Sequence, residues 1–256
     1  MFPIRDTLSW QRFPTVVVGL IAINILTFLY ELSLDAGELQ RFLFEHALVP
    51  RRYFYPSWGA QAGLNPADIS PFLTNTFLHG GLFHIATNLW TLWIFGPALE
   101  ERLGSMRFIV LYLSSGIVAS IAHAVFNATS PIPVLGASGA IAGVIAAYAT
   151  RFPYAWIKVL VLLVIIPVFF YVPALVFAGI WFFIQVLQGT SQLFVPGAGH
   201  NVAWWAHIGG FIAGWLLLRS LDPGNSSHPG PWSRSNGHWQ SGYRNRHISS
   251  LLNRRR

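Results

Sequence analysis

Three polar side chains interrupt apolar stretches, and each precedes a charged residue by nearly the same number of positions. Asn88, Ser138 and His207 are each followed 12 or 13 residues later by a glutamate or an arginine. In a helix, this spacing corresponds to roughly 18–20 Å. If the charges mark one membrane face, the three polar groups meet at one depth in a hydrocarbon core about 30 Å thick. An amide, a hydroxyl and an imidazole at one buried level indicate an oxyanion donor, a nucleophile and a general base.

The composition predicts a membrane protein. Hydrophobic residues make up 54% of the chain and charged residues only 10%, whereas a soluble domain carries roughly 25% charged residues. The net charge of +7 is expected from arginines in cytoplasmic loops beside anionic lipid, and no basic stripe suggests nucleic-acid binding. The absence of cysteine excludes disulfides, a thiol nucleophile and cysteine-bound metal. We therefore expect an all-α, polytopic helix bundle in a lipid bilayer.

Apolar runs predict six transmembrane helices. Ser138 and His207 each lie near the N-terminal end of a run, so their helices must point the same way to share a depth, and one span must separate them. The apolar segment 156–171, broken by Pro167, is then expected to be interfacial or half-inserted. The expected spans are about 14–30, 77–99, 108–126, 138–150, 173–188 and 203–221.

The distribution of Lys and Arg places both termini in the cytoplasm. We expect a cytoplasmic N-terminus at 1–13, a transmembrane domain at 14–221 and a disordered, basic cytoplasmic tail at 222–256. The first apolar run has no small-residue cleavage site after it, so this run should remain in the protein as a membrane anchor. We expect the membrane to be a plasma (inner) membrane. The long first loop, about 31–72, is expected on the outer face as a membrane-associated amphipathic structure, with an ordinary surface loop as the alternative.

The span that begins at Ser138 is short. Its 13 residues before the next charge give a helix of roughly 20 Å, which cannot cross the membrane unaided. The loop 127–137 must therefore enter the membrane, and such backbone is tolerated only inside protein or beside water. A water-accessible recess with Ser138 at its floor is expected. Taken alone, this serine would more often be a helix cap, and His207 a structural histidine; their shared depth favours catalysis.

Two glycine pairs predict that the helices bearing the serine and the histidine pack closely. Gly139 and Gly143 lie four residues apart, as do Gly210 and Gly214, and such small-residue pairs let membrane helices approach each other. Close approach would bring the hydroxyl within hydrogen-bond reach of the imidazole. No Asp or Glu lies near this depth, so we expect a Ser–His dyad without a triad acid.

His84 and Asn88 lie one turn apart on one helix face. Both can donate N–H groups to a carbonyl oxygen. Zinc binding is the alternative, but there is no helical H-E-x-x-H motif and no nearby carboxylate, so we expect neither a metal nor a cofactor. His79, nearer the outer surface, is expected to be a structural hydrogen-bonding residue.

Three motifs occur in order at the expected helix starts: HxxxN at 84–88, GxSG at 136–139 and AHxGG at 206–210. Together they resemble the rhomboid family of intramembrane serine proteases, over about residues 14–221. The resemblance implies a six-helix fold, no cofactor, and cleavage of membrane proteins in or beside a transmembrane helix on the outer side. It also implies a preference for small residues at the cut and for helices that unwind easily.

The resemblance assigns Ser138 as nucleophile and His207 as general base, with His84, Asn88 and the Ser138 backbone N–H around the oxyanion. One position departs from the family: rhomboids often have an aromatic residue that packs on the histidine ring, and here that position is Ala142. Orientation of the ring is then expected from another side chain, either Trp204 or Trp205.

Two other functions fit the sequence less well. A non-catalytic rhomboid-like protein that binds membrane clients would be indicated by loss of the serine or the histidine, and both are present. A channel or transporter would show inverted repeats or charges inside the membrane, and the sequence has neither.

Overall fold

The computed structural model describes residues 2–163, 165–194, 202–222, 224, 232–235 and 238–241. The chain separates into two compact units, residues 1–221 and 222–256. The first unit contains the helices and the second contains the tail.

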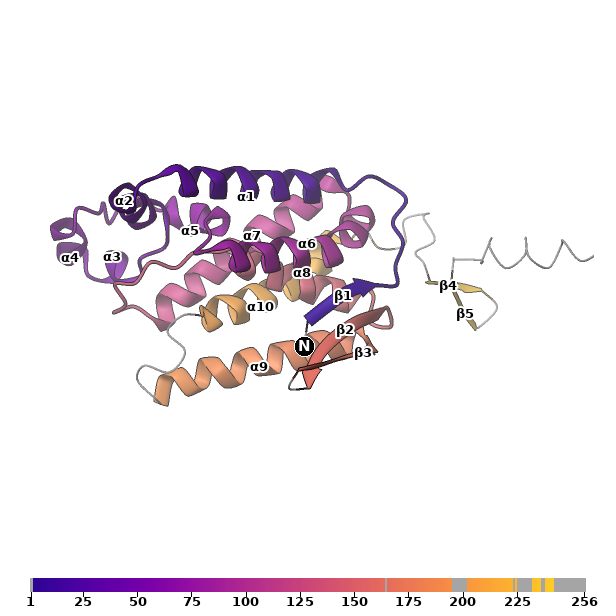
Figure 1. Ribbon diagram of the computed structural model, residues 1–256. Helices are drawn as coiled ribbons and strands as arrows, with labels where there is room; N and C mark the ends of the chain where they lie inside the picture. The colour runs from indigo at the N-terminus through magenta and orange to yellow at the C-terminus, as the bar shows by residue number, and fades with distance from the viewer. Residues whose placement is uncertain are drawn as a thin grey trace, which may run out of the picture. The chain divides into compact units, whose positions relative to one another are not determined.

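In the described part of the first unit, long helices occupy the six expected apolar runs. The central helix is α8, in which every residue from Gly139 to Ala149 is buried. The helices α1 and α9 lie on opposite sides of the bundle (Figure 1). The long helices are α1 (Thr15–Ser33), α6 (Leu82–Leu103), α7 (Ser105–Phe126), α8 (Ser138–Arg151), α9 (Ala174–Phe194) and α10 (Trp204–Leu221).

Three of the described helices are long and apolar enough to cross a membrane: α1, α7 and the stretch Ala174–Ser191 of α9. The count of six spans stays a prediction. The outward faces of α1 and α9 carry exposed apolar side chains such as Leu26, Leu29, Phe183 and Leu187. Such a surface is unfavourable in water and suits contact with lipid chains.

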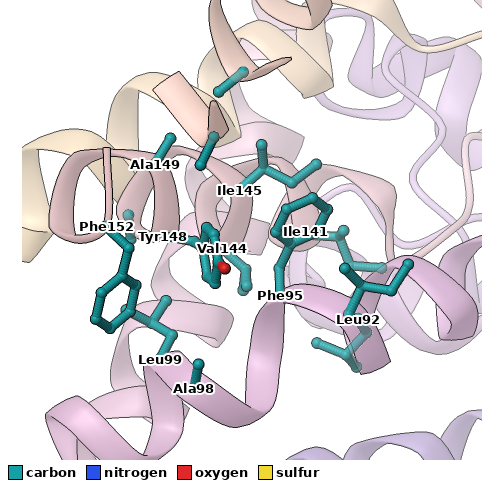
Figure 2. Packing of buried hydrophobic residues seen from close by; sticks show 14 of the residues in the cluster. Leu92, Phe95, Ala98, Leu99, Ile141, Val144, Ile145, Tyr148, Ala149 and Phe152 are labelled. Carbon is teal, nitrogen blue, oxygen red and sulfur yellow. The ribbon is translucent and has the colours of Figure 1, made fainter. Parts of the chain in front are cut away.

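A large part of the hydrophobic core lies between α6 and α8. Figure 2 shows Phe95 and Leu99 of α6 against Ile141, Val144 and Tyr148 of α8. The Phe95 ring meets the Tyr148 ring edge-on, with centroids 5.0 Å apart. The alanines and glycines of α8 occupy little space, so other helices can pack against it from several sides.

A small sheet corrects the all-α prediction. The segment expected to be interfacial or half-inserted forms two antiparallel strands, β2 (Trp156–Leu163) and β3 (Ile166–Pro173), and β2 also pairs with the N-terminal strand β1 (Phe2–Asp6). The segment is rich in Val and Ile and also contains two Phe and one Tyr, all residues that favour strands. Pro167, which we expected to break a helix, lies instead in the edge strand β3, where a proline is tolerated.

The first long loop folds into short helices. Arg52 holds it together, because its buried guanidinium lies 2.9 Å from the Asp68 carboxylate and donates to the Asn65 carbonyl at 2.7 Å. The association of this loop with the membrane stays a prediction. Its helices are α2 (Ala36–His46), α3 (Arg51–Phe54), α4 (Pro56–Gln61), α5 (Pro71–Thr74) and the 3-10 turn η1 (Asn75–Phe77).

The second unit contains a two-stranded hairpin of β4 (Trp232–Ser235) and β5 (His238–Ser241). Most of the tail, for which the sequence predicts disorder, lies outside the described residues.

Candidate active site

Ser138 is the first residue of α8, and the loop before it folds back into the bundle. Leu48 and Val134 exchange backbone hydrogen bonds of 3.0 and 2.8 Å, which tie the loop to the segment before α3. The Gly136 N–H donates to the Asn75 carbonyl at 2.9 Å. With a φ of 127°, Gly136 adopts a conformation that other residues rarely reach. The loop therefore holds the Ser138 hydroxyl at a helix N-terminus, where the first N–H groups lack partners within the helix.

His207 lies in the first turn of α10, and its Nε2 atom is 2.8 Å from the Ser138 Oγ. This is the contact that their matched positions in the sequence predicted. With a lone pair on Nε2, the imidazole can accept a hydrogen bond from the serine hydroxyl and can then take its proton.

The contact depends on glycines at the crossing of α8 and α10. A Cβ atom added to Gly210 would collide with the Gly139 backbone, and one added to Gly214 would collide with the Gly143 backbone. A Cβ atom on Gly139 would in turn lie 2.5 Å from the Ala119 Cβ of α7. The close packing predicted from the two glycine pairs is therefore present, and it brings the two backbones into direct contact.

His84 and Asn88 lie on the first turns of α6, facing the loop that leads to the serine. A Cβ atom added to Gly136 would be 2.7 Å from the His84 ring and 3.7 Å from the Asn88 Nδ2 atom. The Asn88 side chain is buried, and its Nδ2 has no hydrogen-bond partner among the described residues. A buried amide donor is seldom left unpaired, so this group is free to donate to an acceptor oxygen that enters the cavity.

His79 lies beside these groups without reaching the serine. Its ring meets the His84 ring edge-on, with centroids 5.1 Å apart. Its backbone N–H donates to the Glu31 carboxylate at the end of α1, at 3.2 Å. His79 therefore joins α1 to the segment before α6 through its backbone. Its ring packs against His84, and its two ring nitrogens have no hydrogen-bond partner among the described residues, so the expected side-chain hydrogen bond is not seen there.

A cavity of about 630 Å³ is lined by Ser138, His207, His84 and Asn88. Its other walls come from the loop before α8 and the C-terminal end of α7, including His123. In the described part of the chain, no group of three or more His, Asp or Glu side chains is placed to hold a metal ion. The cavity has the size of a small-molecule or side-chain pocket and matches the recess expected beside a short helix.

Comparison with known proteins identifies the family. Residues 66–221 match the family model described as a rhomboid domain. The chain belongs to the rhomboid family. The resemblance that the three motifs indicated is thereby confirmed.

Known rhomboid relatives align over most of this chain. The mouse (Mus musculus) presenilin-associated rhomboid-like protein, mitochondrial, is 31% identical over 208 residues, covering 78% of this chain and 47% of the mouse protein. Rhomboid protein 1, mitochondrial, of Saccharomyces cerevisiae is 26% identical over 218 residues, 81% of this chain and 54% of the yeast protein. The chain thus spans about half the length of these curated relatives.

A third relative is named a protease. The rhomboid protease GluP of Bacillus subtilis is 49% identical over 75 residues, which is 29% of this chain and 14% of that protein. This rhomboid is a membrane protein, as its apolar helices and family indicate. Two of the three relatives are named as mitochondrial, so the comparisons do not confirm the expected plasma membrane.

Of the two tryptophans expected as alternatives beside the rhomboid histidine, Trp204 lies next to the ring. The Trp204 ring lies edge-on to the His207 ring, at 6.2 Å between centroids. Trp205 stacks instead on Phe126 at 3.8 Å. The second ring beside His207 is Trp181 of α9, at 5.7 Å. Ala142, at the position where many rhomboids have an aromatic residue, is fully buried.

Two polar residues of this rhomboid site were not predicted from the sequence. Gln185 of α9 has its Oε1 atom 2.8 Å from the Nδ1 atom of His207. His123 of α7 is buried and lines the cavity. The signal for both was a polar side chain inside a mostly apolar run, the same signal that marked Asn88.

Proposed function

We propose that this rhomboid is an intramembrane serine endopeptidase in which Ser138 and His207 form a catalytic dyad. The observation that carries the proposal is the distance of 2.8 Å between the Ser138 Oγ and the His207 Nε2, beside a cavity inside an apolar helix bundle. The substrates would be membrane proteins cut within or beside a transmembrane helix.

In the acylation step, the Ser138 Oγ attacks the carbonyl carbon of the scissile peptide bond while its proton passes to the His207 Nε2. The resulting tetrahedral intermediate carries a negative charge on the former carbonyl oxygen. When it collapses, the C–N bond breaks and His207 returns the proton to the leaving amine. The products are a free amine on one fragment and an ester between the other fragment and Ser138.

The oxyanion would be stabilised by donors around the serine. The unpaired Asn88 Nδ2–H lies beside Gly136, and the His84 ring lies against the same residue. The Ser138 N–H lies at the N-terminus of α8, where the helix dipole also favours negative charge. Each such donor contributes about 3 kcal/mol to transition-state stabilisation in enzymes of this type.

In the second step, a water molecule in the cavity gives a proton to His207 and attacks the ester carbonyl. When the second tetrahedral intermediate collapses, the C–O bond to Ser138 breaks, His207 returns the proton to the Ser138 Oγ, and a carboxylic acid is released. The cavity is needed because hydrolysis consumes water, which the hydrocarbon core does not supply. The proposed mechanism uses only Ser138, His207, the oxyanion donors and water.

The proposal also includes the orientation of the helices in the membrane. With six spans, both termini and the sheet of β1, β2 and β3 would lie on one membrane side together with Arg151 and Arg219. The catalytic cavity would open toward the opposite side. A substrate helix would approach from within the bilayer.

The proposal is tested with purified protein in liposomes that contain a model transmembrane substrate. Wild type is expected to cleave it and to react with a fluorophosphonate probe, while Ser138→Ala and His207→Ala should lose cleavage by about 10³-fold or more. Ser33→Ala, which removes an exposed hydroxyl on α1, is the matched control. Undiminished cleavage or labelling in Ser138→Ala would refute the proposal.

A further inference from the structure

Gln185 connects the catalytic histidine to a third helix. Its side chain is 5% exposed, and its Oε1 atom is 2.8 Å from the His207 Nδ1. On the other side of the imidazole, the Nε2 atom is 2.8 Å from Ser138. The three side chains therefore form a continuous series of hydrogen bonds from α9 through α10 to α8.

The direction of these bonds follows from a second contact of the same amide. The Gln185 Nε2 donates to the carbonyl oxygen of Trp181, one turn earlier in α9, at 3.2 Å. Because an amide nitrogen only donates and a carbonyl oxygen only accepts, this contact turns the Gln185 Oε1 toward the histidine. An oxygen acceptor at Nδ1 requires a hydrogen on Nδ1.

The proton on Nδ1 determines what the other ring nitrogen can do. In a neutral imidazole, a hydrogen on Nδ1 leaves the lone pair on Nε2. That lone pair faces Ser138 and can receive its hydroxyl proton. In the alternative tautomer, the hydrogen would be on Nε2, between the ring and the serine oxygen. The Nε2 atom would then have no free lone pair and could not act as a base.

We propose that Gln185 is the positioning residue for His207: it fixes the rotation of the imidazole and selects the tautomer that can take the proton from Ser138. The inference rests on the proposed protease function. It also accounts for Ala142. Without an aromatic side chain there, the ring is held by the hydrogen bond from Nδ1 to Gln185 and by the Trp181 and Trp204 rings.

An amide suits this position in a membrane protein. A carboxylate would have to be buried in an apolar helix without a cationic partner, which is strongly unfavourable. A glutamine supplies the same acceptor oxygen without a charge. It therefore orients the ring as the aspartate of a serine-protease triad does, but it provides no charge to stabilise the imidazolium.

The test compares two variants of similar size. Gln185→Met fills the same space and removes the oxygen acceptor. Gln185→Glu in its neutral form can reproduce both hydrogen bonds, because its hydroxyl can donate to the Trp181 carbonyl while its carbonyl accepts from Nδ1. Gln188→Met is the matched control, since Gln188 lies on the same helix and is exposed.

We expect Gln185→Met to lower kcat by at least about tenfold, and by less than the roughly 10⁴-fold that the wrong tautomer costs in a triad protease. KM should change little, because no contact with the substrate is removed. The rate of fluorophosphonate labelling of Ser138 should fall in parallel. Gln185→Glu should restore kcat to within a few-fold of wild type, and Gln188→Met should not differ from wild type.

The outcomes separate this inference from the function itself. If wild type neither cleaves nor labels at Ser138, the protease proposal fails. If wild type is active and Gln185→Met is equally active, the positioning role is refuted. Equal loss in Gln185→Met and Gln185→Glu, accompanied by a lowered Tm in both, would also refute it, because the residue would then serve only packing.

Discussion

The backbone of Gly210 lies directly against the Gly139 backbone, so closely that even a methyl group on Gly210 would overlap the Gly139 carbonyl group. Gly139 follows the serine of the dyad, and Gly210 lies one turn after the histidine. The 2.8 Å contact between Ser138 and His207 is therefore set by how closely α8 and α10 approach. The distance between the serine and the histidine is thus controlled by two glycines.

Gly210→Ala is expected to lower both stability and activity. The added Cβ forces α8 and α10 apart, which we expect to reduce the free energy of unfolding by about 1–3 kcal/mol, as overpacking does elsewhere, and to lengthen the dyad contact. Thermal unfolding in detergent and cleavage of a model substrate measure the two effects. Gly179→Ala is the matched control, because an added Cβ on this α9 glycine meets nothing within 4 Å; comparable losses in both variants would contradict the explanation.

Asn88→Ala is expected to lower kcat by about 10²–10³-fold with little change in KM. The Asn88 Nδ2 is a buried donor beside the serine loop, and loss of one oxyanion donor has an effect of this size in serine proteases. Steady-state cleavage in liposomes separates the two constants. As control, Thr91→Ala removes a hydroxyl on the same helix that bonds only to the Thr87 carbonyl in the described structure. A rise in KM at constant kcat would assign Asn88 to substrate binding instead.

The N-terminal strand is expected to loosen as the pH rises. Asp6 accepts a hydrogen bond of 2.6 Å from the Tyr148 hydroxyl at the end of α8, and burial raises the pKa of its carboxyl group from 3.8 to about 6. The folded protein therefore favours protonated Asp6. Its contribution to stability is fully present below about pH 4 and is lost as the pH rises through about 6. Asp6→Asn should abolish this dependence.

The measurement is the Tm in detergent between pH 5 and pH 7.5. The Tm of Asp6→Asn minus that of wild type should increase with pH. Asp68 provides the opposite case, because hydrogen bonds from Ser70 and the contact with Arg52 lower the pKa of its carboxyl group. Asp68→Asn should therefore destabilise the protein by a constant amount over this range. A constant difference for Asp6→Asn would exclude Asp6 as the titrating group.

The strand that carries Asp6 also marks the main error of the sequence-based prediction. Segment 156–171 is apolar throughout, and apolarity alone does not distinguish a buried strand from a membrane-associated helix. The partner that decides in favour of a strand is β1, which lies about 150 residues earlier in the chain. Pairing between such distant segments leaves no local pattern that a reader of the sequence could recognise.

The sequence on its own determined the positions of the reactive side chains along the chain. These are a serine, a histidine and an amide at nearly equal distances from charged residues, with glycines where two helices cross. Membrane burial makes these signals strong, because a polar side chain in an apolar membrane helix is energetically costly and is usually kept for bonding or function. What only the tertiary structure decided was which groups meet. The approach of Gln185 to the far nitrogen of His207 depends on the rotation of α9 about its axis, and this rotation is set by packing with neighbouring helices.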